Sequence, residues 1–155
     1  MSAAPSDLIA LANRLADASG DAIRPYFRQR IAIDTKADAS PVTIADREAE
    51  QSIRALLADA RPNDGIIGEE LGNENTDAEF VWVIDPIDGT KSFITGRPIF
   101  GTLIALMRNG SPLLGVIDQP IARERWIGLR GEGTTLNGAS VSVRDCPSLA
   151  DATIG

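Results

Sequence analysis

The sequence predicts an α/β fold in which two long helices pack on a mostly antiparallel sheet. Up to residue 58, apolar residues recur at helical spacing, whereas from residue 64 onward short apolar runs follow one another closely. The pairs Asn109-Gly110 and Asn137-Gly138 between these runs are strong signals for tight hairpin turns. The 155 residues are 43% hydrophobic and 24% charged, an ordinary globular composition and enough chain for one domain.

The first helix is expected to begin at Ser6 or Asp7, because either residue can cap a helix N-terminus. Its apolar face comprises Leu8, Leu11, Leu15 and Ala18. The pattern continues through Ile23, Tyr26 and Phe27, but Pro25 predicts a kink or a local restart there.

A second helix is expected over residues 44–58. Its apolar side comprises Ala49, Ile53, Leu56 and Leu57. Asp46 then falls in its first turn, where the helix dipole favours a charged carboxylate. Between the two helices, residues 31–41 alternate weakly and then become polar, which predicts a strand followed by a mobile loop at 36–40.

The second half of the chain is predicted to be a meander of short strands. The candidates are residues 66–67, 81–84, 99–107, 113–117, 125–129 and 141–143. The segment Gly131-Glu132-Gly133 is interpreted as a hairpin turn and not as a phosphate loop, because no helix-forming run follows it.

Composition excludes several classes of site. The chain has no histidine, which excludes Ser-His-Asp and Cys-His catalysis and His-ligated zinc. Its single cysteine, Cys146, cannot form an internal disulfide and is interpreted as an apolar filler. A net charge of −7 with 5% aromatic residues argues against nucleic-acid binding. Without a long apolar span or a signal-peptide pattern, we expect no membrane association and a cytoplasmic enzyme.

The stretch Asp85-Pro86-Ile87-Asp88-Gly89-Thr90 directly follows an apolar strand. Its two carboxylates and the Ile87 carbonyl are the hard oxygen ligands that Mg²⁺ prefers. The Gly89 and Thr90 amides, at a turn that opens a helix, are suited to hold a phosphate group. One loop with both features indicates metal-assisted hydrolysis of a phosphate ester, although Asp-Pro and Asp-Gly pairs also form ordinary turns.

Three further acids lie upstream of this loop. Glu69 and Glu70 end a short apolar run, and Asp46 follows Thr43-Ile44-Ala45. Alone, the first two would be a solvated strand end and Asp46 a helix-capping acid. Together with the loop, they favour a metal site.

These three motifs resemble the inositol monophosphatase family of Mg²⁺-dependent, lithium-sensitive phosphatases. The family pattern comprises Thr-x-x-Asp (Thr43 to Asp46), Gly68-Glu69-Glu70 and the loop Asp85 to Thr90. The continuation Lys91-Ser92-Phe93-Ile94-Thr95-Gly96 is similar to the histidinol-phosphate phosphatase branch. The 3′-phosphonucleotide branch also carries a lysine here, so Lys91 does not separate the branches.

The resemblance implies two or three Mg²⁺ ions, with lithium as an inhibitor. Glu69, Asp85 and the Ile87 carbonyl would hold the first ion, which would activate a water. Asp85 would also bridge to a second ion, which Asp88 binds. Thr90, hydrogen-bonded to Asp46, would orient the attacking water.

The remaining implied roles are more peripheral. The Gly89 and Thr90 amides would bind the phosphoryl oxygens. Glu70, Lys36 and Lys91 are candidates for the outer shell of the site, with ordinary surface charge as the alternative.

The resemblance also implies a layered αβαβα sandwich, of which residues 1–155 would form the amino-terminal metal- and phosphate-binding domain. The family's Trp-Asp-x-x-Ala-Gly motif, which completes the second metal site, does not occur: Val83 follows Trp82 and Ile127 follows Trp126. The chain ends in what looks like a further strand at 151–155. We therefore expect an amino-terminal part that lacks its carboxy-terminal domain, with one apolar face of the sheet uncovered.

Two classes of function remain open at this point. The first is a Mg²⁺-dependent phosphomonoesterase acting on a small phosphorylated metabolite, homodimeric at full length. Histidinol phosphate is the preferred substrate, and inositol-1-phosphate, fructose-1,6-bisphosphate and a 3′-phosphonucleotide are the alternatives. The second is a non-catalytic metal-binding module, which the missing third aspartate favours.

Overall fold

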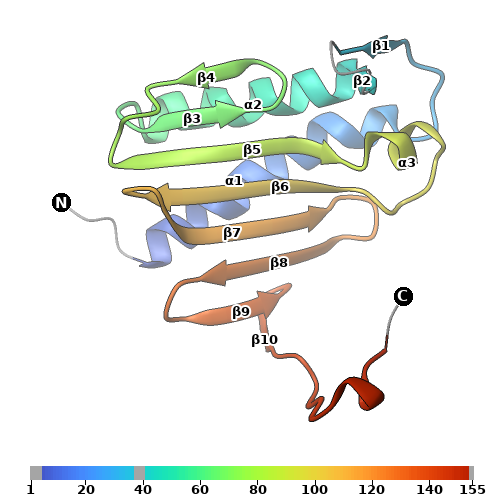
Figure 1. Ribbon diagram of the computed structural model, residues 1–155. Helices are drawn as coiled ribbons and strands as arrows, with labels where there is room; N and C mark the ends of the chain where they lie inside the picture. The colour runs from blue at the N-terminus through green and yellow to red at the C-terminus, as the bar shows by residue number, and fades with distance from the viewer. Residues whose placement is uncertain (1–4, 37–40, 154–155) are drawn as a thin grey trace.

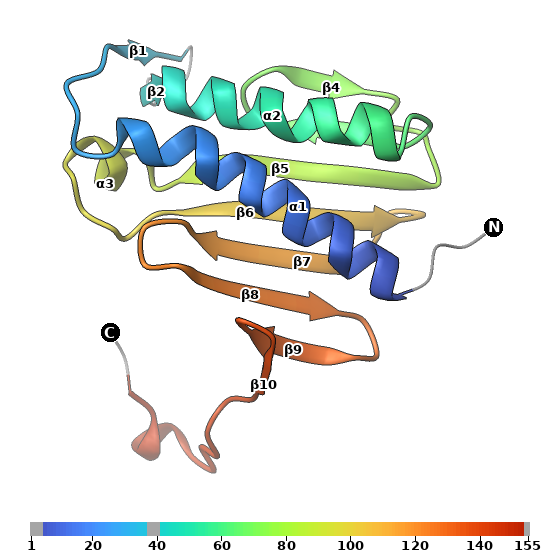
Figure 2. The ribbon, with the colours of Figure 1, turned by 180° about the vertical axis from the view of Figure 1, so that it is seen from behind.

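The computed structural model describes residues 5–36 and 41–153. Helices α1 (Pro5–Ile23) and α2 (Ile44–Ala60) lie side by side on one face of an eight-stranded sheet (Figures 1 and 2). The two long helices and the sheet expected from the sequence are therefore confirmed.

The first helix ends where the proline predicts. Leu8, Leu11 and Leu15 of α1 are buried against the sheet. The α-helix stops at Ile23, and the short 3₁₀ helix η1 (Arg24–Tyr26), with Pro25 inside it, continues the chain. The change of helix type is the local restart expected there, because proline lacks the amide that the α-helical ladder needs.

Strand β1 (Ile33–Thr35) pairs antiparallel with β2 (Pro41–Thr43), and β2 leads directly into α2. Of the loop expected at 36–40, residues 37–40 lie outside the described part of the chain. Thr43 and Asp46 form a capping box at the start of α2. The cap explains why the helix begins at Ile44 and why Asp46 is in its first turn.

The main sheet has the order β10-β9-β8-β7-β6-β5-β3-β4. Its strands are β3 (Gly65–Gly68), β4 (Gly72–Glu74), β5 (Phe80–Asp88), β6 (Gly101–Arg108), β7 (Ser111–Gln119), β8 (Glu124–Leu129), β9 (Gly133–Leu136) and β10 (Ala139–Val141). Every neighbouring pair is antiparallel except β3 and β5, which are parallel. Both predicted Asn-Gly turns are confirmed, with positive φ at each of their residues.

Several boundaries differ from the sequence-based expectation. Strands β2, β4 and β9 were not expected, because short polar strands lack an apolar alternation to reveal them. The strand expected at 141–143 is β10 and ends at Val141. The strand expected at the chain end is wrong for residues 151–153, because the 3₁₀ helix η2 (Leu149–Asp151) precedes extended chain there.

The helices cover one face of the sheet and leave the other open (Figure 1). Trp82, Ile84, Ile104 and Leu106 belong to the core beneath the helices. On the opposite face, Ile117 is 53% exposed, and Trp126 lines an apolar hollow of about 570 Å³. The uncovered apolar face is confirmed. Among the described residues, no helix is both long and apolar enough to cross a membrane.

Candidate active site

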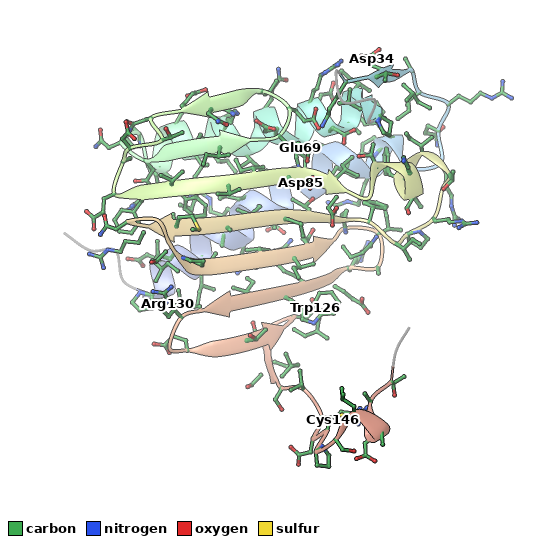
Figure 3. All side chains as sticks on the ribbon, in the orientation of Figure 1. Asp34, Glu69, Asp85, Trp126, Arg130 and Cys146 are labelled. Carbon is green, nitrogen blue, oxygen red and sulfur yellow. The ribbon has the colours of Figure 1, made fainter. Side chains whose placement is uncertain are left out.

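The predicted site residues gather where the parallel strands β3 and β5 end. The Glu69 amide donates to the Ile84 carbonyl at 3.1 Å, which continues the strand pairing one residue beyond Gly68. Glu69 and Asp85 therefore lie on neighbouring segments at the same end of the sheet (Figure 3). Parallel strands place their carboxyl ends together, as in many α/β ligand sites.

A bulge in β5 shifts the strand register between Asp85 and Asp88. Asp85 pairs with Leu103 and Asp88 with Gly101, so β5 uses one residue more than β6 over this step. The Thr102 hydroxyl donates to the Pro86 carbonyl at 2.8 Å and lies 3.0 Å from the Ser19 hydroxyl of α1. This buried chain of hydrogen bonds ties the bulge to the first helix.

The loop then turns into the short helix α3 (Thr90–Ile94), as expected. Gly89 makes the turn with φ 90°, a left-handed conformation that a side chain would strain. Phe93 of α3 packs edge-on against Phe100 with ring centroids 5.1 Å apart, which anchors the helix to the domain. The first amides of a helix lack intrahelical acceptors, so the Gly89–Thr90 turn is compatible with phosphate binding.

One expected contact is wrong. The Thr90 hydroxyl donates to the Ile87 carbonyl at 3.0 Å, not to Asp46. Asp46 Oδ2 instead accepts from the Thr43 hydroxyl at 2.6 Å and from the Thr43 amide at 2.8 Å. The reason is local, because Thr43, three residues away, already satisfies this buried carboxylate as part of the helix cap.

The carboxylates of the site are crowded. Burial raises the pKa of Asp85 to about 8, aided by a hydrogen bond with Glu69 and by the negative charges of Glu69 and Asp88. The Lys36 ammonium lies 2.6 Å from both Glu69 Oε1 and Glu70 Oε1 and partly offsets this repulsion. Lys36 is thus in direct contact with the site, as expected of an outer-shell residue.

The two acids nearer the helices show the same tendency. Burial raises the pKa of Asp46, although its hydrogen bonds with Thr43 act in the opposite direction. Burial also raises the pKa of Glu70 against the effect of Lys36. Lys91, the last outer-shell candidate, is exposed and is the second residue of α3.

The donor set fits a hard divalent cation in its chemistry. Glu69, Asp85 and Asp88 supply carboxylates, and Ile87 supplies a carbonyl at the same strand end. A cation would relieve the repulsion that raises the pKa of Asp85. Within residues 5–36 and 41–153, however, no three acidic side chains are close enough to hold an ion as they stand. Binding would therefore require side-chain rotation that brings these carboxylates closer together.

One buried acid next to the site escaped the sequence analysis. Glu50 of α2 is fully buried, and its carboxylate accepts from the backbone amides of Glu70 and Leu71. The available signal was its spacing: Glu50 follows Asp46 by four residues and so lies on the same helix face. An acid on the buried face of a helix requires a partner.

Comparison with known proteins decides the relationship. The family model described as "Inositol monophosphatase family" matches residues 4–155. The chain belongs to the inositol monophosphatase family. A solved structure of an inositol monophosphatase from Zymomonas mobilis shares 54% identity and a TM-score of 0.80, covering 94% of this chain and 56% of that one.

Two curated relatives of this chain carry different phosphatase names. A bifunctional chloroplastic phosphatase (IMPL2) of Arabidopsis thaliana is 55% identical over 92% of this chain and 42% of its own length. A histidinol-phosphatase of Mycobacterium tuberculosis is 44% identical over 82% of this chain and 49% of its own. The chain thus spans about half the length of the curated relatives it matches.

Proposed function

We propose that this chain is the metal- and phosphate-binding domain of a Mg²⁺-dependent phosphomonoesterase. The observation that carries the proposal is the crowding of Glu69, Asp85 and Asp88 at one strand end, where the pKa of Asp85 rises to about 8. Family membership supports the same reaction class, since named relatives are phosphatases. The reaction adds water to phosphorus, breaks the ester P–O bond and releases an alcohol and phosphate.

Four groups of this chain would hold the metal: the carboxylates of Glu69, Asp85 and Asp88 and the carbonyl of Ile87. Magnesium, when bound, supplies positive charge against the phosphate and lowers the pKa of a water molecule. Glu70 and Lys36 would adjust the charge around these ligands, since Lys36 forms ion pairs with both Glu69 and Glu70.

Thr90 is suited to orient the attacking water. Because its hydroxyl hydrogen is donated to the Ile87 carbonyl, the oxygen keeps lone pairs that can accept a hydrogen from water. The amides of Gly89 and Thr90 would donate to phosphoryl oxygens, where negative charge grows during the reaction. Asp46 would act one layer behind, by fixing the start of α2 through the hydrogen bonds that it accepts from Thr43.

We prefer histidinol phosphate as the substrate, which would place the enzyme in histidine biosynthesis. Histidinol-phosphatases of three organisms are 44%, 42% and 42% identical to the chain. Inositol-1-monophosphatases at 40% and 38% identity make inositol-1-phosphate the second candidate.

The test is phosphate release by the purified chain from histidinol phosphate and from inositol-1-phosphate, with Mg²⁺ and with EDTA. We expect Mg²⁺-dependent release that is faster with histidinol phosphate. Faster release from inositol-1-phosphate would overturn the substrate assignment and keep the reaction. Mn²⁺ binding by calorimetry without any release would support the non-catalytic metal-binding module instead.

A further inference from the structure

The loop that carries Glu69 and Glu70 is held from below by a buried ion pair of α2. Glu50 is 0% exposed, in a position where an unpaired carboxylate would be strongly unfavourable. Its Oε2 accepts from the Glu70 amide at 2.8 Å, and its Oε1 accepts from the Leu71 amide at 3.2 Å. One side chain thus satisfies two consecutive amides of the turn between β3 and β4.

Arg54, one helical turn further along α2, completes the arrangement. Its Nε donates to Glu50 Oε1 at 2.8 Å, its Nη1 to Glu74 Oε1 at 2.6 Å, and its Nη2 to the Gly72 carbonyl. Arg54 therefore balances the buried charge of Glu50 and also binds both ends of β4. The guanidinium and the carboxylate together hold the whole β3–β4 turn against α2.

Gly68 shows how closely the turn approaches this pair. A Cβ on Gly68 would lie 1.9 Å from Glu50 Oε1 and 2.5 Å from Arg54 Nη2, so the ion pair would have to move to admit a side chain. A side chain at position 68 would therefore disturb the ion pair, whereas the φ of Gly68, outside the left-handed region, does not itself call for glycine.

We propose that Glu50, braced by Arg54, is a positioning residue for the Glu69–Glu70 turn, which carries the proposed metal ligand Glu69. The inference rests on the proposed function. Glu50 itself is not a metal ligand in this scheme, because its carboxylate already accepts three hydrogen bonds. It fixes the backbone from which Glu69 reaches Asp85 and Glu70 reaches Lys36.

Glu50→Gln tests the proposal with almost no change of shape. An amide group presents NH₂ where the carboxylate presented an acceptor, so at least one donor among the Glu70 amide, the Leu71 amide and Arg54 loses its partner. We expect Mn²⁺ affinity, measured by calorimetry on the full chain, to fall by about 10- to 100-fold, the usual effect of removing such an orienting partner. Hydrogen exchange at the Glu70 and Leu71 amides, followed by NMR, should accelerate.

Glu48→Gln is the matched control. Glu48 lies on the same helix but accepts from the Tyr26 hydroxyl at 2.8 Å and does not touch the turn. We expect this variant to keep the Mn²⁺ affinity and the exchange rates of the two amides. Equal weakening of Mn²⁺ binding in both variants would overturn a specific role for Glu50.

Arg54→Lys keeps the test decisive if Glu50→Gln does not fold. It retains the positive charge but loses the forked contacts to Gly72 and Glu74. We therefore expect a smaller loss of Mn²⁺ affinity than in Glu50→Gln, with faster hydrogen exchange at the same two amides, Glu70 and Leu71. If either variant folds and keeps its Mn²⁺ affinity, the positioning role of Glu50 is wrong, but the proposed function stands. Failure of the unmodified chain to bind Mn²⁺ contradicts the proposed function and removes the basis of the inference.

Discussion

Two clusters of acidic residues in this protein differ in how far their negative charge is balanced. The Arg125 cluster, between α1 and β8, consists of Arg125, Asp118, Asp17 and Asn13. The site cluster, at the ends of β3 and β5, consists of Lys36, Asp46, Glu69, Glu70, Asp85 and Asp88. Both bury carboxylates, but the proportion of positive charge in them differs.

In the Arg125 cluster, a single guanidinium satisfies its neighbours. Its Nε lies 2.7 Å from Asp118 Oδ1, and its Nη2 lies 2.8 Å from Asp17 Oδ1. Burial opposes the charge of Arg125, but the hydrogen bonds that it donates to Asp17 and Asp118 raise its pKa overall. Asp118 is 3% exposed and directly paired, so the cluster is complete without a ligand.

In the site cluster, one ammonium faces several carboxylates. Lys36 contacts Glu69 and Glu70, whereas the pKa of Asp85 still rises to about 8 through burial, Glu69 and Asp88. A fold retains such unbalanced acids where another cation enters the site. The comparison therefore distinguishes a structural ion pair from a candidate metal centre by charge balance, and not by burial alone.

The largest expected effect separates the two clusters by function. Asp85→Asn removes a proposed metal ligand, so we expect Mg²⁺-dependent phosphate release to fall by at least about 100-fold, which corresponds to about 2.7 kcal/mol of transition-state stabilisation. Steady-state phosphate release measures this. Turnover that survives the change would show that the assigned ligand set is wrong.

Asp118→Asn should instead affect stability. The variant leaves Arg125 with a neutral acceptor in a buried position, and we expect the free energy of unfolding to fall by about 1–3 kcal/mol. Urea denaturation measures the change, and calorimetry with Mn²⁺ should give an unchanged affinity. A loss of Mn²⁺ binding without a loss of stability would reverse the roles assigned to the two clusters.

A third expected effect is a pH dependence of stability in EDTA. The pKa of Asp85 is 3.8 for an ordinary side chain and about 8 in the folded chain, so between these values the folded state retains a proton that the unfolded state has lost. Stability should therefore be greatest near pH 4 and decline as the pH rises toward 8. Asp46, Glu70 and Asp118, whose pKa values are also raised, act in the same direction.

Urea denaturation at several pH values between 4 and 8 checks this dependence. Asp85→Asn should flatten the decline, because its side chain does not titrate, whereas Asp118→Asn should flatten it less. Parallel profiles for the unmodified chain and Asp85→Asn would mean that crowding at the site does not affect folding.

Features with a local cause were predictable from the sequence. The amphipathic helices, the interruption at Pro25 and the two Asn-Gly turns depend on residues within a few positions of one another. The bulged loop from Asp85 to Thr90 was identified for the same reason, since its donors lie next to each other in the chain. Strands β2, β4 and β9 were not predictable, because their pairing partners stabilise them and their own short sequences do not.

The sequence by itself determined which residues can form a site, and the tertiary structure decided which of them meet. Lys36 and Glu69 are 33 residues apart, and Glu50 and Glu70 are 20 apart, yet both pairs are in hydrogen-bond contact. The Thr90 hydroxyl was expected at Asp46 and is found at the Ile87 carbonyl, three residues away. Contacts of this kind depend on the distances and directions that the packing of α2 against the β3–β4 turn sets, and no spacing along the chain encodes them.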